Sequence, residues 1–342
     1  MIELQTAWGW QPALYLFLGG VGGGAFAFAA ILHCFDRKNT ERTVCVSMWV
    51  ALVCLGVGLL CLLTELTAPL RGLMMWQSFS HLTSWMAIGA WILFAAAFVF
   101  FAAACLATIN LVRAKKGEES LGGASFTVLV VVGAVLGVGV AVYTGILLMS
   151  AQGVGFWHTP LLVALFSVSA FDTGIAAVEL IHFGQSAHER MSDAVHSKMN
   201  KAVIGLVVVE SVVLVALFGG ALAQGDSTSS AAAYSASAIL TGQFSPWFWI
   251  LVAGLGLLLP LVAALAQIKH GLDVRFDAGD TAETSDCLQG RVEGSSAAPL
   301  AIAGALGALI GGCALRFIVV YAGAHSGVVG ATMDQIFNSM LL

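Results

Sequence analysis

Three carboxylates lie inside long apolar stretches of this chain, where charged groups are rare. They are Asp172, Glu179 and Glu210, and Glu65 lies at the end of a further apolar stretch. A carboxylate in hydrocarbon is costly and normally faces a cavity, a partner or a proton path. We therefore treat Asp172, Glu179 and Glu210 as candidates for a proton path. The alternative is that they only satisfy one another or nearby hydroxyl groups.

A basic residue, Arg316, also lies inside an apolar stretch. Its long side chain could snorkel to the nearer surface or pair with one of the carboxylates. The neighbouring Gly311 and Gly312 indicate a packed helix face, which favours pairing. We therefore assign Arg316 to the same candidate proton path.

A second polar group gathers near the ends of several apolar stretches, on the side that the distribution of charge described below assigns to the outer surface. It combines hydrogen-bond donors and titratable side chains with an apolar surrounding. Its members are Gln11, Tyr15, Glu65, His81, Tyr143 and His158. A quinone needs access from lipid for its tail, donors for its carbonyl oxygens and a group that exchanges protons. We therefore predict quinone binding there, whereas the tryptophans at the same level fit an interface belt.

The histidines and cysteines argue against a metal cofactor in this chain. His33 and His182 end apolar stretches, and no histidine pair faces across mid-membrane depth, as a transmembrane haem would require. The 7 cysteines include no CxxC pair, which argues against an iron–sulfur cluster or a zinc site. We expect no haem, no iron–sulfur cluster and no metal.

The composition places these groups in a membrane protein. The chain is 59% hydrophobic and only 10% charged, with a mean hydropathy of +0.94. Several apolar runs are near or above the roughly 20 residues that a helix needs to cross hydrocarbon. They predict eight spanning helices at about Pro12–His33, Val44–Thr64, Ser84–Val112, Ser125–Met149, Thr159–His182, Ala202–Gln224, Pro246–Ile268 and Pro299–Tyr321. The fold class is therefore all-α and polytopic.

The basic residues are distributed asymmetrically across the predicted membrane. The connections after the first, third, fifth and seventh spans carry nearly all of the Lys and Arg residues, whereas the other connections hold only Arg71. Positive charge marks cytoplasmic loops. Both termini are therefore expected on the outer, periplasmic side of a bacterial inner (cytoplasmic) membrane.

Residues 1–342 form one integral membrane domain in this interpretation. We expect residues 65–83 to form an outer interfacial loop and the polar segment 269–298 to form a flexible cytoplasmic loop. The Ser- and Ala-rich outer connection Gly225–Ser245 carries one acid, Asp226, and indicates no chemistry. The glycine cluster Gly19–Gly24 predicts close packing of the first helix.

Several segments together resemble the NrfD/PsrC family over nearly the whole chain. The most specific are the acid-plus-proline loop that follows the second span and the Tyr-x-Gly that ends the fourth. The segments are WGWQPALYLFLGGVGGGAF, TELTAPLRGLMMWQSFSHLTSWMAIGAW, YTGILL, FWHTPLLVALFSVSA and LTGQFSPWFW.

This resemblance implies an eight-helix, haem-free subunit that binds menaquinone or ubiquinone near the outer face. It implies a ferredoxin-like iron–sulfur partner, which in turn serves a molybdenum or multihaem catalytic subunit that holds the site for the terminal substrate. By motif, Tyr143 matches the family's quinone-contacting tyrosine and Glu65 matches the acid of the loop.

Two other functions stay open at this point. A proton-coupled secondary transporter could use Asp172 and Glu210, although no convincing inverted repeat is visible in the sequence. A purely structural anchor would tether a partner without touching quinone. Membrane lipid surrounds the chain in each case, and no nucleic-acid partner is expected.

Overall fold

The computed structural model describes residues 3–5, 8–65, 84–151, 153–185, 191–223, 227–279 and 297–325. Within these ranges, 8 helices are long and apolar enough to cross a membrane. The predicted all-α, polytopic fold class is thereby confirmed. The helices that supply the spans are α1 (Trp10–Phe35), α2 (Glu41–Glu65), α4 (Trp85–Lys115), α5 (Gly123–Met149), α6 (Pro160–Gln185), α7 (Asp193–Ala223), the continuous α9 (Ser245–Trp247), η3 (Phe248–Leu258) and α10 (Leu259–Gly279), and α12 (Ala297–Tyr321).

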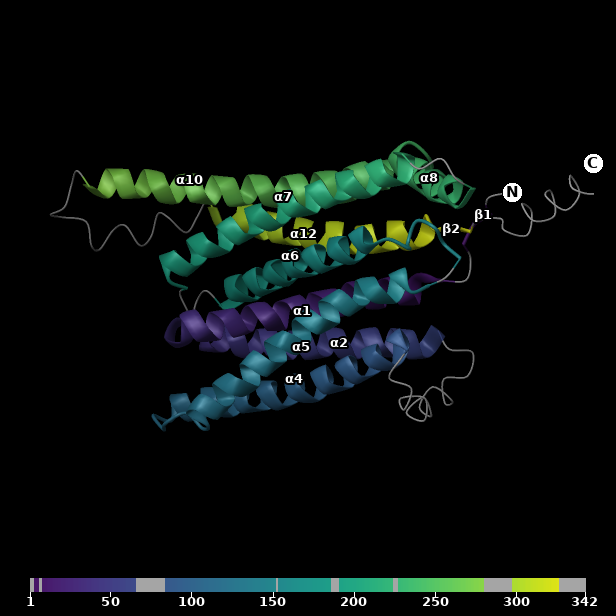
Figure 1. Cartoon of the computed structure of the whole chain (residues 1–342). Helices are drawn as coiled ribbons and strands as arrows, with labels where there is room; N and C mark the ends of the chain where they lie inside the picture. The colour runs from purple at the N-terminus through teal and green to yellow at the C-terminus, as the bar shows by residue number, and fades with distance from the viewer. Residues whose placement is uncertain are drawn as a thin grey trace, which may run out of the picture.

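The helices form two groups that meet along α1 and α6. One group consists of α1, α2, α4 and α5, and the other consists of α6, α7, α12 and the η3–α10 helix. Figure 1 shows α1 and α6 side by side in the middle of the bundle, with α4 on one outer side and α7 and α10 on the other. Helix α1 contacts both α6 and α12, so the two groups pack against each other along α1.

Helix α1 is the central element because its glycines let three neighbours approach. In the most apolar 18-residue stretch of α1, 72% of the residues are buried, against 28% in that of α2. A Cβ on Gly22 would meet the Ala51 carbonyl of α2 at 2.8 Å, one on Gly23 would clash with Gly137 of α5, and one on Gly24 would clash with Ala170 of α6. The predicted close packing of this glycine cluster is confirmed.

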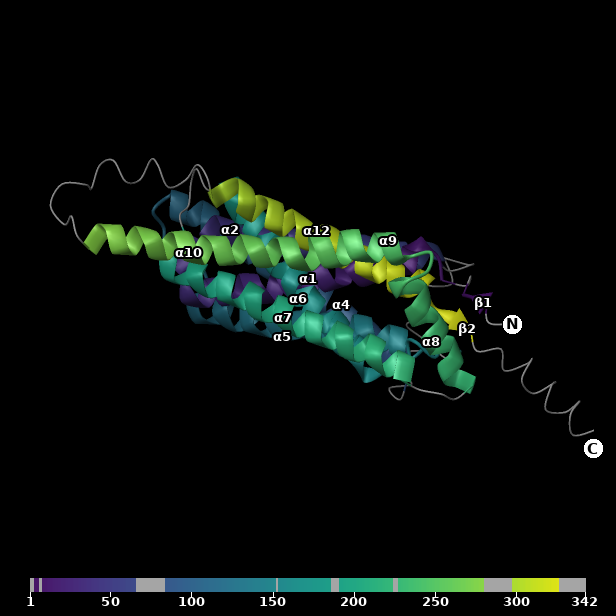
Figure 2. The ribbon, with the colours of Figure 1, turned by 90° about the horizontal axis from the view of Figure 1, so that it is seen from above.

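The two ends of the described chain meet at one end of the bundle. Strand β1 (Glu3–Leu4) pairs antiparallel with β2 (Ala324–His325), and the Gln5 side chain donates to the Val320 carbonyl over 3.0 Å. Figure 2 shows both strands beside α8 at this end, which we call the sheet end. The sequence analysis did not foresee this two-residue pairing, because segments so short carry no strand pattern.

Helix α8 (Ser227–Leu240) forms within the predicted outer connection Gly225–Ser245. Alanine is the strongest helix former, and Ala231, Ala236 and Ile239 are fully buried against neighbours that include α7. The predicted loop 269–298 also begins later than expected, because α10 continues to Gly279. Residues 280–296, and the predicted loop beyond Glu65, lie outside the described residues.

Proline accounts for a change of helix type in the seventh span. The segment η3 is a π-helix, and the Leu259 amide that follows it donates to the Gly254 carbonyl, five residues back. Pro260 has no N–H, and its ring clashes with the carbonyl four residues earlier in an α-helix. The wider π turn avoids that clash, and Gly256 of this segment packs against Gly311 of α12.

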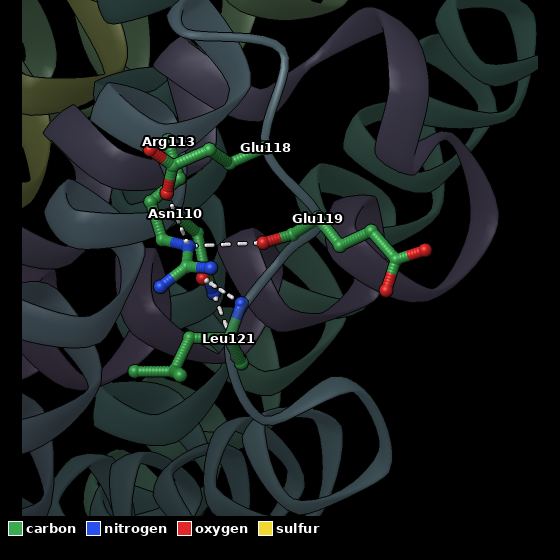
Figure 3. Close-up of polar contacts among 5 residues, drawn as sticks. All are labelled: Asn110, Arg113, Glu118, Glu119 and Leu121. Carbon is green, nitrogen blue, oxygen red and sulfur yellow. Dashed lines mark hydrogen bonds and ion pairs between the residues drawn. The ribbon is translucent and has the colours of Figure 1, made fainter.

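The end opposite the strands, which we call the basic end, is closed by polar contacts within the connections. Figure 3 shows the turn between α4 and α5, where Arg113 donates to the Glu119 carbonyl and forms an ion pair with Glu118 at 3.4 Å. Asn110 accepts from the Leu121 amide over 2.7 Å. Between α1 and α2 lies η1 (Arg37–Asn39), and Asp36 just before it accepts from the Ser192 amide at the start of α7.

We predict that Gly174→Ala destabilises the junction of the two groups. Its Cβ would meet the Ala25 amide nitrogen at 2.6 Å and the Gly24 Cα at 2.7 Å, and overpacking costs about 1–3 kcal/mol. The thermal midpoint in mild detergent should fall. Gly205→Ala in α7, where a Cβ meets nothing within 4 Å, is the matched control, and an equal midpoint for both variants would contradict the packing argument.

Candidate functional site

Two tyrosines from α1 and α5 lie close together in the sheet-end half of the first helix group. Tyr15 is fully buried, and no group in the described part of the chain hydrogen-bonds to its hydroxyl. Tyr143 is 6% exposed, and its helix neighbour Thr144 lies beside Tyr15: a Cβ built on Gly19 would be 3.4 Å from a Thr144 methyl and 3.7 Å from a ring carbon of Tyr15. Helix rise places Tyr143 about 9 Å from the sheet-end terminus of α5.

Small residues on neighbouring helices leave room for both rings. A Cβ on Gly58 of α2 would lie 3.2 Å from a ring carbon of Tyr15. A Cβ on Gly89 of α4 would clash with the phenol end of Tyr143. The two hydroxyl groups are therefore held in an apolar site between α1, α2, α4 and α5.

Glu65 and Gln11 meet at the sheet end, where α2 ends and α1 begins. The Gln11 amide oxygen lies 2.8 Å from the point at which a Cβ on Gly9 would stand, and a Glu65 carboxylate oxygen lies 3.9 Å from the same point. The structure thus brings these two candidate residues together, nearer to the surface than the tyrosines.

The two histidines of the predicted quinone site are not joined to this group. His158 is exposed in the connection between α5 and α6, and its Nδ1 lies 3.1 Å from the Met149 carbonyl that ends α5. No hydrogen bond in the described ranges links it to Tyr143 or Glu65. His81 lies outside the described residues.

Arg316 lies in the interior of the second helix group and has 0% exposure. It donates to Ser169 Oγ and to the Gly312 carbonyl, both over 2.8 Å, and to the Phe166 carbonyl over 3.3 Å. Its guanidinium also lies over the ring of Phe17 in α1, 6.0 Å from the centroid. Arg316 therefore does not snorkel, and it connects α12 to both α6 and α1.

The predicted pairing of Arg316 with a carboxylate is not seen as a direct ion pair in the described ranges. Ser169 accepts from Arg316, and Ser169 and Glu210 line the same space between the helices. The buried cation therefore contacts a hydroxyl that lies beside the acid of α7.

The three buried acids lie along one region between α6 and α7. Asp172, Glu179 and Glu210 are 3%, 6% and 4% exposed, and Asp172 interacts electrostatically with both of the others and with Arg316. Glu179 is buried although it lies near the end of α6, and it lines the same space as Gln267 of α10. One oxygen of each of Asp172 and Glu179 has no partner in the described part of the chain.

Two adjoining spaces follow these acids through the second helix group. One runs from Glu179, Asn200 and Gln267 to Asp172. Its empty volume is about 300 Å³ including the part open to solvent, and only about 10 Å³ of it is wide enough for water. That is room for about one water molecule. The other continues from Asp172 to Glu210 and measures about 190 Å³, but no part of it admits water. The acids are therefore connected by a route that is dry between Asp172 and Glu210.

Some residues of these sites were missed by the sequence analysis. Asn200 and Gln267 line the larger space, and Gly89 receives the ring of Tyr143. Amide side chains near the ends of two spans are a signal that could have identified the first two residues. No such signal exists for Gly89, since its role depends on which helix packs against α5. In the described ranges, no group of three or more His, Cys, Asp or Glu side chains could hold a metal ion.

The sequence is similar to two curated proteins over nearly its whole length. It is 29% identical to the C subunit of polysulfide reductase from Wolinella succinogenes over 336 residues, covering 93% of this sequence and 94% of that protein. It is 28% identical to "Protein NrfD" of Escherichia coli K12 over 343 residues, covering 93% of this sequence and 95% of that protein.

A family model described as "Polysulphide reductase, NrfD" matches residues 3–276. This match includes α1 to α7 and nearly all of the η3–α10 helix, and thus both tyrosines and the three buried acids. The resemblance seen in the sequence is confirmed, and this chain belongs to the polysulphide reductase NrfD family.

Proposed function

We propose that this chain is the membrane anchor of a respiratory oxidoreductase and binds menaquinone or ubiquinone near the sheet end. The observation that carries the proposal is the pair of phenols, Tyr15 and Tyr143, held in an apolar site with one hydroxyl buried and unpartnered. A buried hydroxyl without a partner costs about 1–3 kcal/mol, and a carbonyl oxygen of a ligand would remove that cost.

The residues present fit a quinone head group. When bound, a quinone supplies two-electron, two-proton redox chemistry. Tyr143 donates to one carbonyl oxygen, and Tyr15 supplies a second hydroxyl on the α1 side. Glu65, with Gln11 beside it, is the titratable group through which protons reach the sheet-end surface. His81 and His158 remain proposed members of that exit.

The electrons of the quinone require a partner on the same side. The cysteine spacing of this chain provides no iron–sulfur motif, and the relative from Wolinella succinogenes is by its name one subunit of a larger reductase. We propose a ferredoxin-like iron–sulfur subunit at the sheet end that serves a molybdenum or multihaem catalytic subunit. The terminal substrate would react in that subunit and not in this chain.

A second activity, proton coupling, is supported by the buried acids. Asp172, Glu179 and Glu210 follow one another between α6 and α7, and the space that reaches Asp172 from Glu179 admits water. A proton entering from the basic end would pass Glu179 and then Asp172. Glu210 lies beyond them, beside Ser169, which accepts a hydrogen bond from Arg316. A secondary transporter would use the same acids, but the paired phenols and the family favour a quinone-linked subunit.

We propose that the chain lies in a bacterial inner membrane with the basic end in the cytoplasm. The connections at that end carry almost all of the Lys and Arg residues, which marks the cytoplasmic side. The sheet end, with both ends of the described chain, would face the periplasm.

We predict that Tyr143→Phe lowers quinol-linked turnover of the assembled complex. Losing one hydrogen bond to the quinone should reduce kcat/KM roughly 2- to 10-fold, whereas the ring and its packing remain. Turnover is measured in membranes with a short-chain quinol analogue. Tyr234→Phe in α8, whose tyrosine is 44% exposed, is the control. Unchanged turnover with normal assembly would leave a purely structural anchor as the better interpretation.

The proposed orientation predicts which connections a membrane-impermeant maleimide can reach. In a variant whose native cysteines are replaced by serine, Gln243→Cys at the sheet end should react in spheroplasts. Glu118→Cys at the basic end should react only after the membrane is permeabilised. The reverse pattern would place the sheet end in the cytoplasm and would contradict both the orientation and the partner's side.

If protons cross the chain, Asp172→Asn and Glu210→Gln should abolish proton transfer but preserve quinol turnover. Each substitution keeps the side-chain shape and removes the charge. Proton release per quinol is measured in sealed vesicles that contain the whole complex. Glu118→Gln, at an exposed turn of the basic end, is the matched control. If both interior variants release the same number of protons per quinol as the wild type, these acids contribute only to helix packing.

A further inference from the structure

The position of the Tyr143 ring is determined by a glycine on the neighbouring helix. Gly89 is buried near the start of α4, and a Cβ built on it would clash with three atoms of Tyr143: Cζ, Cε2 and the hydroxyl oxygen. All three belong to the outer part of the phenol. The hydroxyl of Tyr143 therefore lies against the backbone of α4, in space that any side chain on residue 89 would fill.

Packing is what holds the hydroxyl there. No hydrogen bond anchors the Tyr143 hydroxyl within the described ranges. A tyrosine side chain on a helix has few allowed rotamers. If a side chain at residue 89 pushed the ring away from α4, the ring would adopt another orientation and its hydroxyl oxygen would move. The position of the oxygen thus depends on the absence of a side chain at residue 89.

Gly139, another glycine between α4 and α5, does not contact Tyr143. A Cβ on Gly139 of α5 would meet only Ile92 Cγ2 of α4, at 3.4 Å, which is an ordinary van der Waals contact. Gly139 and Gly89 therefore both lie between α4 and α5, but only Gly89 contacts a side chain of the proposed quinone site.

We propose that Gly89 is a positioning residue for quinone: it sets the place of the Tyr143 hydroxyl that donates to the quinone carbonyl. This inference rests on the proposed quinone function. It adds a residue of α4 to the proposed site. A displacement of about 1 Å at such a contact can cost up to about 100-fold in rate.

The test compares Gly89→Ala with Gly139→Ala in membranes that contain the whole complex. We expect Gly89→Ala to lower kcat/KM for a short-chain quinol by at least the roughly 2- to 10-fold expected for loss of the hydroxyl, and to weaken binding of a hydroxyquinoline N-oxide, a quinone analogue followed by its fluorescence. Gly139→Ala should match the wild type in both measurements. Wild-type turnover and analogue binding in Gly89→Ala would overturn the proposal.

A double variant separates positioning from general disruption. If Gly89 acts through Tyr143, then adding Gly89→Ala to Tyr143→Leu should cause no further loss of kcat/KM, because leucine lacks the outer ring atoms that the new Cβ would clash with. If the substitution merely damages the helix packing, the two losses should multiply, and that result contradicts the proposal.

The same double variant covers the case in which Gly89→Ala alone fails to assemble. Tyr143→Leu removes the ring, so Gly89→Ala should be tolerated in that background, with the same assembly and thermal midpoint as Tyr143→Leu alone. Failure of the double variant to assemble would show that Gly89 faces something other than Tyr143. Tyr143→Phe alone decides the quinone function: if it retains full turnover, that function fails, whereas a loss there without a loss in Gly89→Ala sinks only the role of Gly89.

Discussion

The whole structure depends on the close approach of three helices to the backbone of α1. Three consecutive glycines, Gly22 to Gly24, face α2, α5 and α6 in turn, and each leaves no space for a Cβ. In a membrane, lipid tails are as apolar as the side chains, so helices gain little from burying apolar surface and associate instead through close packing. A side chain at any of these positions would separate α1 from a neighbour and would disturb both helix groups.

The central position of α1 also links the two polar regions. At its sheet-end part it carries Tyr15 of the proposed quinone site. One half-turn further it carries Phe17, over which the guanidinium of Arg316 lies. Arg316 in turn donates to Ser169, which lines the same space as Asp172 and Glu210. Helix α1 therefore contacts both the proposed quinone site and the buried cation.

Hydrocarbon imposes a further constraint on the second helix group. Buried charge is tolerated there only where polar neighbours replace water. Arg316 receives this from two backbone carbonyls and a hydroxyl. One oxygen of Asp172 and one of Glu179 have no partner in the described part of the chain, and both acids line the space that admits water. The two acids with an unpaired oxygen thus lie along the route that water can enter.

The sequence by itself determined the class, the eight spans, the family and the residues able to do chemistry. Hydropathy and motif spacing are properties of local sequence, and they do not depend on how helices pack. Only the tertiary structure decided which of these residues meet. It packed Tyr15 against the part of α5 that carries Tyr143, buried Glu179, and gave Arg316 a hydrogen bond to Ser169 beside Glu210. It also gave Gly89 its contact with Tyr143, because the neighbour of a glycine is chosen by helix packing, and a residue without a side chain leaves no pattern from which that neighbour could be inferred.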